Sequence, residues 1–529
     1  MKRLIFFPIL CLLTSLQTFA QNAIVTMTTT KDSVNIYVEW SGSGSITANG
    51  VELRAENVNT VPAAADGSVA LMATGGAQLT TLWCGFHYLA LEDTKLPMLM
   101  EHDENSLTAL NIINCPELMV LECSYNSLTA LDVTNCPKLT SLGCDHNLLS
   151  ALDVTMCPEL TKLWCSDNPI YFLDVSNCAE LTLLHCSDNS LTTLDVTNCS
   201  MLTRLDCDTN PLTALDVMKC PMLTILDCGN NSLTALNVTN CPELNTLNCS
   251  YNPLKVLDVT NCPKLTTLYC RKNSLTTLDV TKCPMLTRLD CGTNLLTALD
   301  VTRCPMLTRL DCGTNSLTAL NVTNCMELNN LECHNNALDA LDVTKCPMLT
   351  RLACYNNSLT ALDVTNCLEL KSLGCYNNSL TALDVTNCTK LNELDCSNNS
   401  LSVLNITNYL GHLSANNQSP ILPMTIPDGN KLSIKNPVTF PGAEVKIANI
   451  SNSGTYEDGN ITWEVSGENG EETFSFITKL PNDGISGNPF SGTVTQPWEK
   501  QKNIKKTTII FLILGSVLLV SCLYRNFKM

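Results

Sequence analysis

Cysteines recur in this chain in pairs eight residues apart, and thirteen residues separate one pair from the next. Fourteen such pairs lie between Cys115 and Cys396 and hold 28 of the 31 cysteines. Zinc sites usually need two cysteines two to four residues apart, and that spacing does not occur. Cysteines that repeat in one column point the same way, which is poor geometry for disulfides. We therefore interpret them as small apolar side chains buried in a narrow core, with disulfides as the alternative.

A second column carries carboxylates in the motif Leu-Asp-Val. Its members are Asp132, Asp153, Asp174, Asp195, Asp216, Asp258, Asp279, Asp300, Asp342, Asp363 and Asp384, with Asn111, Asn237, Asn321 and Asn405 at the remaining registers. Like charges in neighbouring repeats repel, so these carboxylates either bind calcium or accept hydrogen bonds from nearby turn amides. We favour hydrogen bonding, because asparagine takes the same place without disturbing the pattern.

The positions around the second cysteine of each pair vary from repeat to repeat, whereas the Leu-Asp-Val half hardly changes. Aromatic residues and arginines gather there, and these are the usual anchors of recognition surfaces. We predict a ligand-binding face at these positions; neutral drift on a solvated sheet is the alternative. The candidate residues are Trp164, His185, Arg204, Tyr251, Tyr269, Arg288, Asp290, Arg309, Asp311, Arg351, Tyr355 and Tyr376.

Motifs for catalysis are missing from the sequence. It contains no G-x-S-x-G, no H-E-x-x-H and no phosphate-binding loop, and its six histidines are scattered over separate repeats. A net charge of −19 and a pI near 4.7 argue against binding a polyanion such as nucleic acid. We therefore expect no catalysis, no cofactor and no metal site.

The cysteine and aspartate columns belong to a 21-residue repeat, L-T-x-L-x-C-x-x-N-x-L-T-x-L-D-V-T-x-C-P-x, which continues without insertion from Cys115 to Cys396. Its half LTRLDCGTN, residues 307–315, resembles the core of the leucine-rich repeat family. The bacterial 21-residue nested subclass, with its internalin-like and BspA-like surface proteins, is the most similar. The resemblance covers residues 77–417. It implies parallel β coils and asparagines, such as Asn147, that are buried and bond the turn backbone.

The expected fold class is mainly β: a leucine-rich repeat solenoid of parallel 21-residue coils with small β caps and a C-terminal transmembrane helix. A basic start and a short apolar run predict a signal peptide at residues 1–20. We expect an N-terminal β cap at 21–76, the solenoid at 77–417 and a small β domain or stalk at 418–505. The uncharged run 507–524 predicts a transmembrane helix over 506–524, followed by a short tail at 525–529. A lipoprotein-like signal joined by gene fusion is the alternative for this run.

The family resemblance implies an exported, non-catalytic protein of the cell envelope, held at the surface by a single membrane span. It would bind macromolecules through the variable strand face. The expected partners are an extracellular protein or a glycan, and the membrane through the C-terminal helix, but no nucleic acid; the oligomeric state is not assigned. A structural spacer of the envelope or matrix, without a specific ligand, is the alternative.

Overall fold

The computed structural model describes residues 24–56, 58–75, 77–84, 106–406, 411–440, 445–478 and 486–500. The chain divides into two compact units, Met1–Asn357 and Ser358–Met529, called unit 1 and unit 2 below. The expected signal peptide at 1–20 and the segment 506–529 lie outside the described residues.

One part of the expected fold class was wrong. The prediction included a C-terminal transmembrane helix, whereas no helix in the described ranges is both long enough and apolar enough to cross a bilayer. The uncharged run that suggested this helix gives only a length and a hydropathy, and neither specifies a helix by itself. The β solenoid of the prediction is confirmed by the strands of the repeat.

Unit 1 begins with strands that are mostly antiparallel. They are β1 (Val25–Thr29), β2 (Ser33–Ser41), β3 (Ile46–Ala48), β4 (Val51–Glu52), β5 (Val58–Pro62), β6 (Ser68–Ala73), β7 (Gln78–Trp83) and β8 (Leu107–Ile112). Five form a sheet in the order β4-β3-β6-β1-β8, and β2 pairs with both β5 and β7. Val34, Ile36 and Val38 are buried, as the period of two in β2 predicts. Strand β7 then pairs in parallel with β9 and so begins the repeat.

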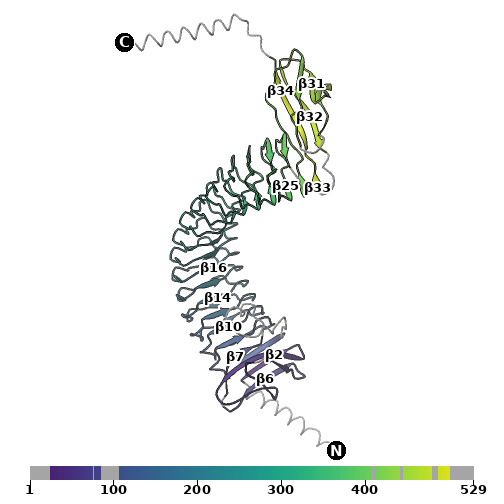
Figure 1. Ribbon diagram of the computed structural model, residues 1–529. Helices are drawn as coiled ribbons and strands as arrows, with labels where there is room; N and C mark the ends of the chain where they lie inside the picture. Colours follow the sequence, from purple (N-terminus) through teal and green to yellow (C-terminus); the bar gives the residue numbers. More distant parts are fainter. Residues whose placement is uncertain are drawn as a thin grey trace, which may run out of the picture. The chain divides into compact units, whose positions relative to one another are not determined.

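The repeat in unit 1 forms one short parallel strand per coil, and Figure 1 shows these strands stacked as rungs. They are β9 (Val120–Glu122), β10 (Ser141–Gly143), β12 (Lys162–Trp164), β14 (Leu183–His185), β15 (Arg204–Asp206), β16 (Ile225–Asp227), β17 (Thr246–Asn248), β18 (Thr267–Tyr269), β19 (Arg288–Asp290), β20 (Arg309–Asp311), β21 (Asn330–Glu332) and β22 (Arg351–Ala353). Pairing is in register, as in Leu289 with Leu310. These leucines and the cysteines after each strand are buried, so each coil adds one identical layer to the core.

The asparagine of each coil bonds the backbone of its own and the preceding coil. Asn147 Nδ2 donates to the carbonyls of Cys123 (3.0 Å) and Cys144 (3.1 Å), and its Oδ1 accepts from the Leu128 amide at 2.9 Å. The residue before it, His146, has a left-handed φ of 50°, and its counterparts in the other coils share this conformation. The turn therefore hides backbone groups from water, and the asparagine supplies partners for them. The expectation of a buried, structural asparagine is confirmed.

The cysteines pack as two buried columns. All 29 cysteines among the described residues are buried. In the first-cysteine column the Sγ of Cys283 lies 3.6 Å from Val259 O, and the Sγ of Cys304 lies 3.6 Å from Val280 O. Burial raises the pKa of Cys283 to about 11 and that of Cys304 to about 12. The interpretation as buried thiols that fill a narrow core is confirmed.

These thiols should react slowly with a disulfide reagent at pH 8 while the protein is folded. A pKa about two units above normal lowers the thiolate fraction about a hundredfold, and burial slows access further. Labelling followed by peptide mapping should find the repeat cysteines modified only after unfolding in urea. Met306→Cys, at a side chain that is 49% exposed, is the fast-reacting control. Rapid modification of several repeat thiols in the folded chain would contradict the expectation.

The aspartate column lies on another edge of unit 1, where β11 (Leu152–Asp153) pairs with β13 (Leu173–Asp174). Asp300 Oδ1 accepts hydrogen bonds from the Thr302 amide (2.9 Å) and hydroxyl (2.6 Å). Asn321 Oδ1 accepts the same pair from Thr323, at 3.0 and 2.8 Å. These hydrogen bonds lower the pKa of Asp300, and the bond from the Thr302 hydroxyl has the larger effect. The interpretation that this column caps turn amides is confirmed.

Unit 2 contains further coils followed by two antiparallel sheets, and Figure 1 labels several of its strands. Its parallel strands are β23 (Ser372–Gly374), β25 (Glu393–Asp395), β27 (His412–Ser414) and β33 (Ser486–Asn488), with the pair β24 (Ala382–Asp384) and β26 (Val403–Asn405). The antiparallel sheets are β28 (Lys431–Lys435), β31 (Asn460–Glu464) and β30 (Thr455–Glu457), and β29 (Val445–Ala448), β32 (Asn469–Thr478) and β34 (Ser491–Glu499), with the 3-10 turn η2 (Ser451–Ser453). Trp463 and Phe474 are buried, and their ring centroids lie 6.3 Å apart.

Candidate functional site

The side chain at the last position of each strand, just before the second cysteine of the pair, forms a column along unit 1. Tyr269, Asp290 and Asp311 are successive members in register. Asp206 is only 4% exposed, and Tyr269, Asp290 and Asp311 are half-buried. Coils stack about 4.8 Å apart, which is less than the width of these side chains, so each one covers part of its neighbour.

An open groove of about 660 Å³ runs along this column between Tyr125 and Tyr269. We call it the acidic groove. Six aspartates line it: Asp145, Asp167, Asp188, Asp206, Asp208 and Asp227. Arg204 is the one arginine or lysine among its lining residues, which also include His146 and His185. The groove is therefore strongly negative at neutral pH.

A hydrogen-bonded network crosses the middle of the acidic groove. Ser166 Oγ lies 3.1 Å from His185 Nδ1, and His185 Nε2 lies 2.5 Å from Asp206 Oδ2. Arg204 Nε donates to the same oxygen at 2.7 Å. Ser166 is 7% exposed, and its Oγ also accepts from the Ser187 amide at 3.0 Å. The Ser166 hydroxyl is therefore held between the His185 ring and the Ser187 amide, and the network fixes the positions of these side chains.

The carboxylates of the acidic groove repel one another; Asp145 and Asp206 are buried, whereas Asp167 and Asp188 are exposed. Burial raises the pKa of Asp145 to about 7, although the Ser166 amide and His185 oppose it. Burial and the charge of Asp208 raise the pKa of Asp227 to about 6. At His185 burial lowers the pKa, but the hydrogen bond and charge of Asp206 outweigh it, so the pKa lies above its usual value.

A second, smaller hollow of about 230 Å³ follows along the same column. Its lining includes five of the predicted site residues: Tyr269, Arg288, Asp290, Arg309 and Asp311. Two of its carboxylates pair with arginines from outside the lining: Arg271 Nη1 lies 2.7 Å from Asp311 Oδ2, and Arg351 Nε lies 3.5 Å from Glu332 Oε1. Burial and the charge of Asp311 raise the pKa of Asp290 to about 6.

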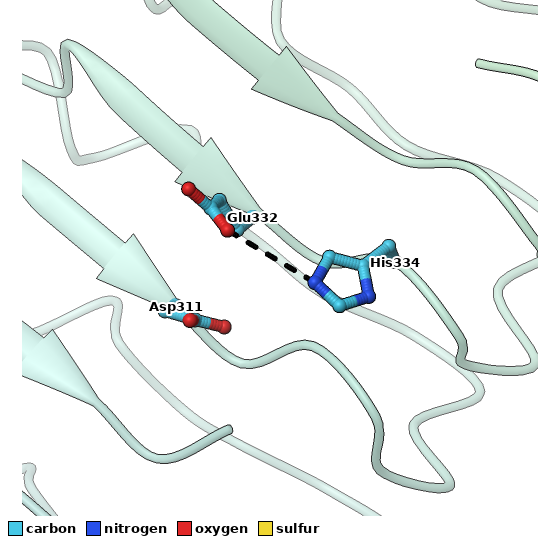
Figure 2. Close-up of side chains that lie close together, drawn as sticks. All are labelled: Asp311, Glu332 and His334. Carbon is cyan, nitrogen blue, oxygen red and sulfur yellow. Dashed lines mark ion pairs between the residues drawn. The ribbon is translucent and has the colours of Figure 1, made fainter. Parts of the chain in front are cut away.

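Within the described part of the chain, Asp311, Glu332 and His334 form a group that could hold a metal ion, since their ligand atoms lie within 4.8 Å of one another. Figure 2 shows the His334 ring beside Glu332, with Asp311 on the neighbouring strand. Glycine at 313 makes room, because a Cβ there would lie 2.6 Å from the His334 ring. The ring also stacks on Tyr355, with centroids 4.5 Å apart.

The atoms of these three residues that could bind a metal already contact other protein groups. Arginines pair with both carboxylates, and His334 Nδ1 accepts from Asn335 Nδ2 at 3.0 Å. The neutral ring then carries its proton on Nε2, the nitrogen that lies 4.0 Å from Glu332. The three residues thus fit an ion-pair network better than a metal centre, whose ligands must present free lone pairs.

The predicted site residues fall into several places. His185, Arg204 and Tyr269 line the acidic groove, and the five residues named above line the second hollow. Tyr251 is 45% exposed, and Lys272 Nζ lies 4.7 Å above its ring. Trp164 ends β12 and is half-buried, whereas Tyr376 belongs to unit 2.

Sequence reasoning missed several groove residues, including Asp145, Ser166, Ser187 and Asp208. Each directly follows the second cysteine of its pair. Tyr355 and Tyr376 are predicted site residues at this same position, but its serines and aspartates were not among the candidates, although their side chains line the groove. Its content of serine and aspartate over successive repeats was the available signal.

Three comparisons place the chain among known proteins. The family model described as LRR adjacent matches residues 442–499. Internalin I of Listeria monocytogenes serotype 4b (strain F2365) is 36% identical over 89 residues, which cover 16% of this chain and 5% of that protein. The chain therefore spans only a small part of that relative's length.

Solved structures extend the similarity over most of the chain. The functional domain of InlJ from Listeria monocytogenes, which includes a cysteine ladder, is 33% identical with a TM-score of 0.65; the match covers 75% of this chain and 89% of that one. A leucine-rich repeat protein of Leptospira interrogans shares the fold at 24% identity and a TM-score of 0.50, over 54% of this chain and 79% of that one.

Proposed function

Because this chain belongs to the internalin-like family of leucine-rich repeat proteins, we propose that it is a non-catalytic binding protein that recognises another protein through the strand column of unit 1. We further propose that it is exported, as the basic and apolar start of the sequence suggests, and that it works at the cell envelope, as its resemblance to internalin-like surface proteins suggests.

The observation that carries the binding role is the pair of neighbouring hollows along one column. They bring aromatic, arginine and aspartate side chains together over successive coils. Binding energy at protein interfaces is concentrated in such aromatic and arginine anchors. Tyr269 lines both hollows, so it lies at the centre of the proposed face.

Protein and glycan arrays probed with the full chain test this role. We expect the triple variant Tyr269→Ala, Arg288→Ala, Arg309→Ala to bind protein targets at least about tenfold more weakly. The matched control is Phe172→Ala, Lys282→Ala, Arg303→Ala, which removes one aromatic and two cations outside the lining of both hollows. Equal binding by the two variants would contradict the proposed face. Binding to glycans alone would replace a protein partner with a sugar, and no binding at all would favour the spacer.

A further inference from the structure

We propose that the acidic groove binds an extended lysine- or arginine-rich segment of a partner protein. This inference rests on the proposed function and names the class of partner. It follows from the charge of the groove, one buried hydroxyl and the groove's length.

The acidic groove has more carboxylates than positively charged side chains. Arg204 and His185 both contact Asp206, and His146 Nε2 lies 3.1 Å from Asp167. Asp188 and Asp208, in contrast, lie close to other carboxylates. Burial and the negative charges of Asp167 and Asp208 raise the pKa of Asp188. A bound ammonium or guanidinium group would offset this repulsion.

Ser187 points to a ligand independently of the charge. Its side chain is 6% exposed and lines the groove. Its Oγ is buried and has no hydrogen-bond partner in the part of the chain that the structure describes. Buried hydroxyls are normally satisfied, and this one can accept a hydrogen bond from a lysine or arginine that enters between the aspartates.

The length of the groove favours a peptide over an ion or a small amine. Between the coils of β9 and β18 there are seven parallel pairings, which at about 4.8 Å each span about 34 Å, the length of about ten extended residues. The aspartates follow this axis and do not converge; among the described residues the metal-capable group found is at Asp311. Tyr125 and Tyr269 stand at the two ends, where they offer rings for cation-π contacts.

Two sets of variants with equal charge change test the groove. The groove variant is Asp188→Asn, Asp208→Asn, Asp227→Asn. The control is Asp195→Asn, Asp216→Asn, Asp258→Asn, in the capping column of nearby coils, where asparagine already occurs at 237. Ser187→Ala is the third variant. Circular dichroism establishes that each is folded.

The probe is a fluorescein-labelled decapeptide of five Lys-Thr repeats, titrated into the full chain by fluorescence anisotropy, beside a Glu-Thr decapeptide and chitohexaose. We expect the Lys-Thr peptide to bind, the groove variant to weaken binding about tenfold or more, Ser187→Ala severalfold and the control less than about twofold. Binding should also weaken as salt rises.

Equal weakening by the groove and control variants would mean attraction to net charge alone and would overturn the inference. So would binding of chitohexaose that displaces the peptide. A chain that binds proteins on the array but ignores the Lys-Thr peptide refutes the basic partner and leaves the proposed function intact. Absence of binding in both experiments refutes both.

Discussion

Asn294→Ala should lower the free energy of unfolding by about 3–5 kcal/mol. The Asn294 Nδ2 donates to the carbonyls of Cys270 and Cys291 at 3.0 Å and of Gly292 at 3.3 Å, and its Oδ1 accepts from the Leu275 amide at 3.0 Å. The side chain is 7% exposed. Alanine would therefore leave buried backbone groups of two successive coils without partners, and it cannot replace them with a bond of its own.

Urea unfolding followed by circular dichroism measures this loss. Asn321→Ala is the matched control, because the same substitution there removes bonds to Thr323 at an exposed turn; it should cost less than about 1 kcal/mol. If the coils around Asn294 unfold separately from the rest, only part of the urea unfolding curve should shift to lower urea concentration. Equal losses of unfolding free energy in the two variants would show that burial of the Asn294 side chain does not decide how much its hydrogen bonds stabilise the chain.

Glu122→Gln should raise the free energy of unfolding by about 4 kcal/mol at pH 8 and by less than about 1 kcal/mol at pH 4.5. Glu122 is 5% exposed, and burial raises its pKa to about 8, against the hydrogen bond from Ser124. The folded chain thus holds a proton that the unfolded chain releases above pH 4.5. The raised pKa of Glu122 therefore does not destabilise the fold at low pH. The destabilisation grows as the pH rises and reaches its full size above about pH 8. Glutamine, which cannot ionise, removes it.

Unfolding curves at several values between pH 4.5 and pH 8 test the sign as well as the size. Asp132→Asn is the control, because the hydroxyl and amide of Thr134 lower the pKa of this carboxyl; its contribution is present at neutral pH and is lost on acidification. The control should not stabilise the chain at pH 8. An increase for Glu122→Gln that is the same at every pH would show that ionisation is not its source.

The repeated parts of the fold could be predicted from the sequence because one coil imposes its pattern on the next. A leucine such as Leu289 and a cysteine such as Cys291 alternate with polar residues, and their burial follows from the pleat of the strand. The capping role of Asp300 was predictable for a different reason, since asparagine at 321 fills the same place. Because the same residue types recur at the same positions in many coils, their structural roles are clearer than they would be from one coil alone.

The proposed binding face could be predicted only in part. The varied positions around the second cysteine identified His185, Arg204 and Tyr269, but they did not show that Asp206 is buried or that Ser166 and Ser187 lie beside it. These properties depend on which side chains of neighbouring coils meet, and the residue types at each position do not show those contacts. The transmembrane helix failed for a related reason, because apolar length alone supported it.

Residues 283–294 and 304–315 have the same sequence, and the coil geometry explains why such copies are tolerated. The strand of each coil pairs only with the strands on either side, as β19 does with β18 and β20. Recombination that adds or removes a whole 21-residue segment therefore preserves the core, the asparagine ladder and the capping turns. A change in the number of repeats then changes the length of the strand column that carries the proposed binding face, while the packing between the remaining coils is kept.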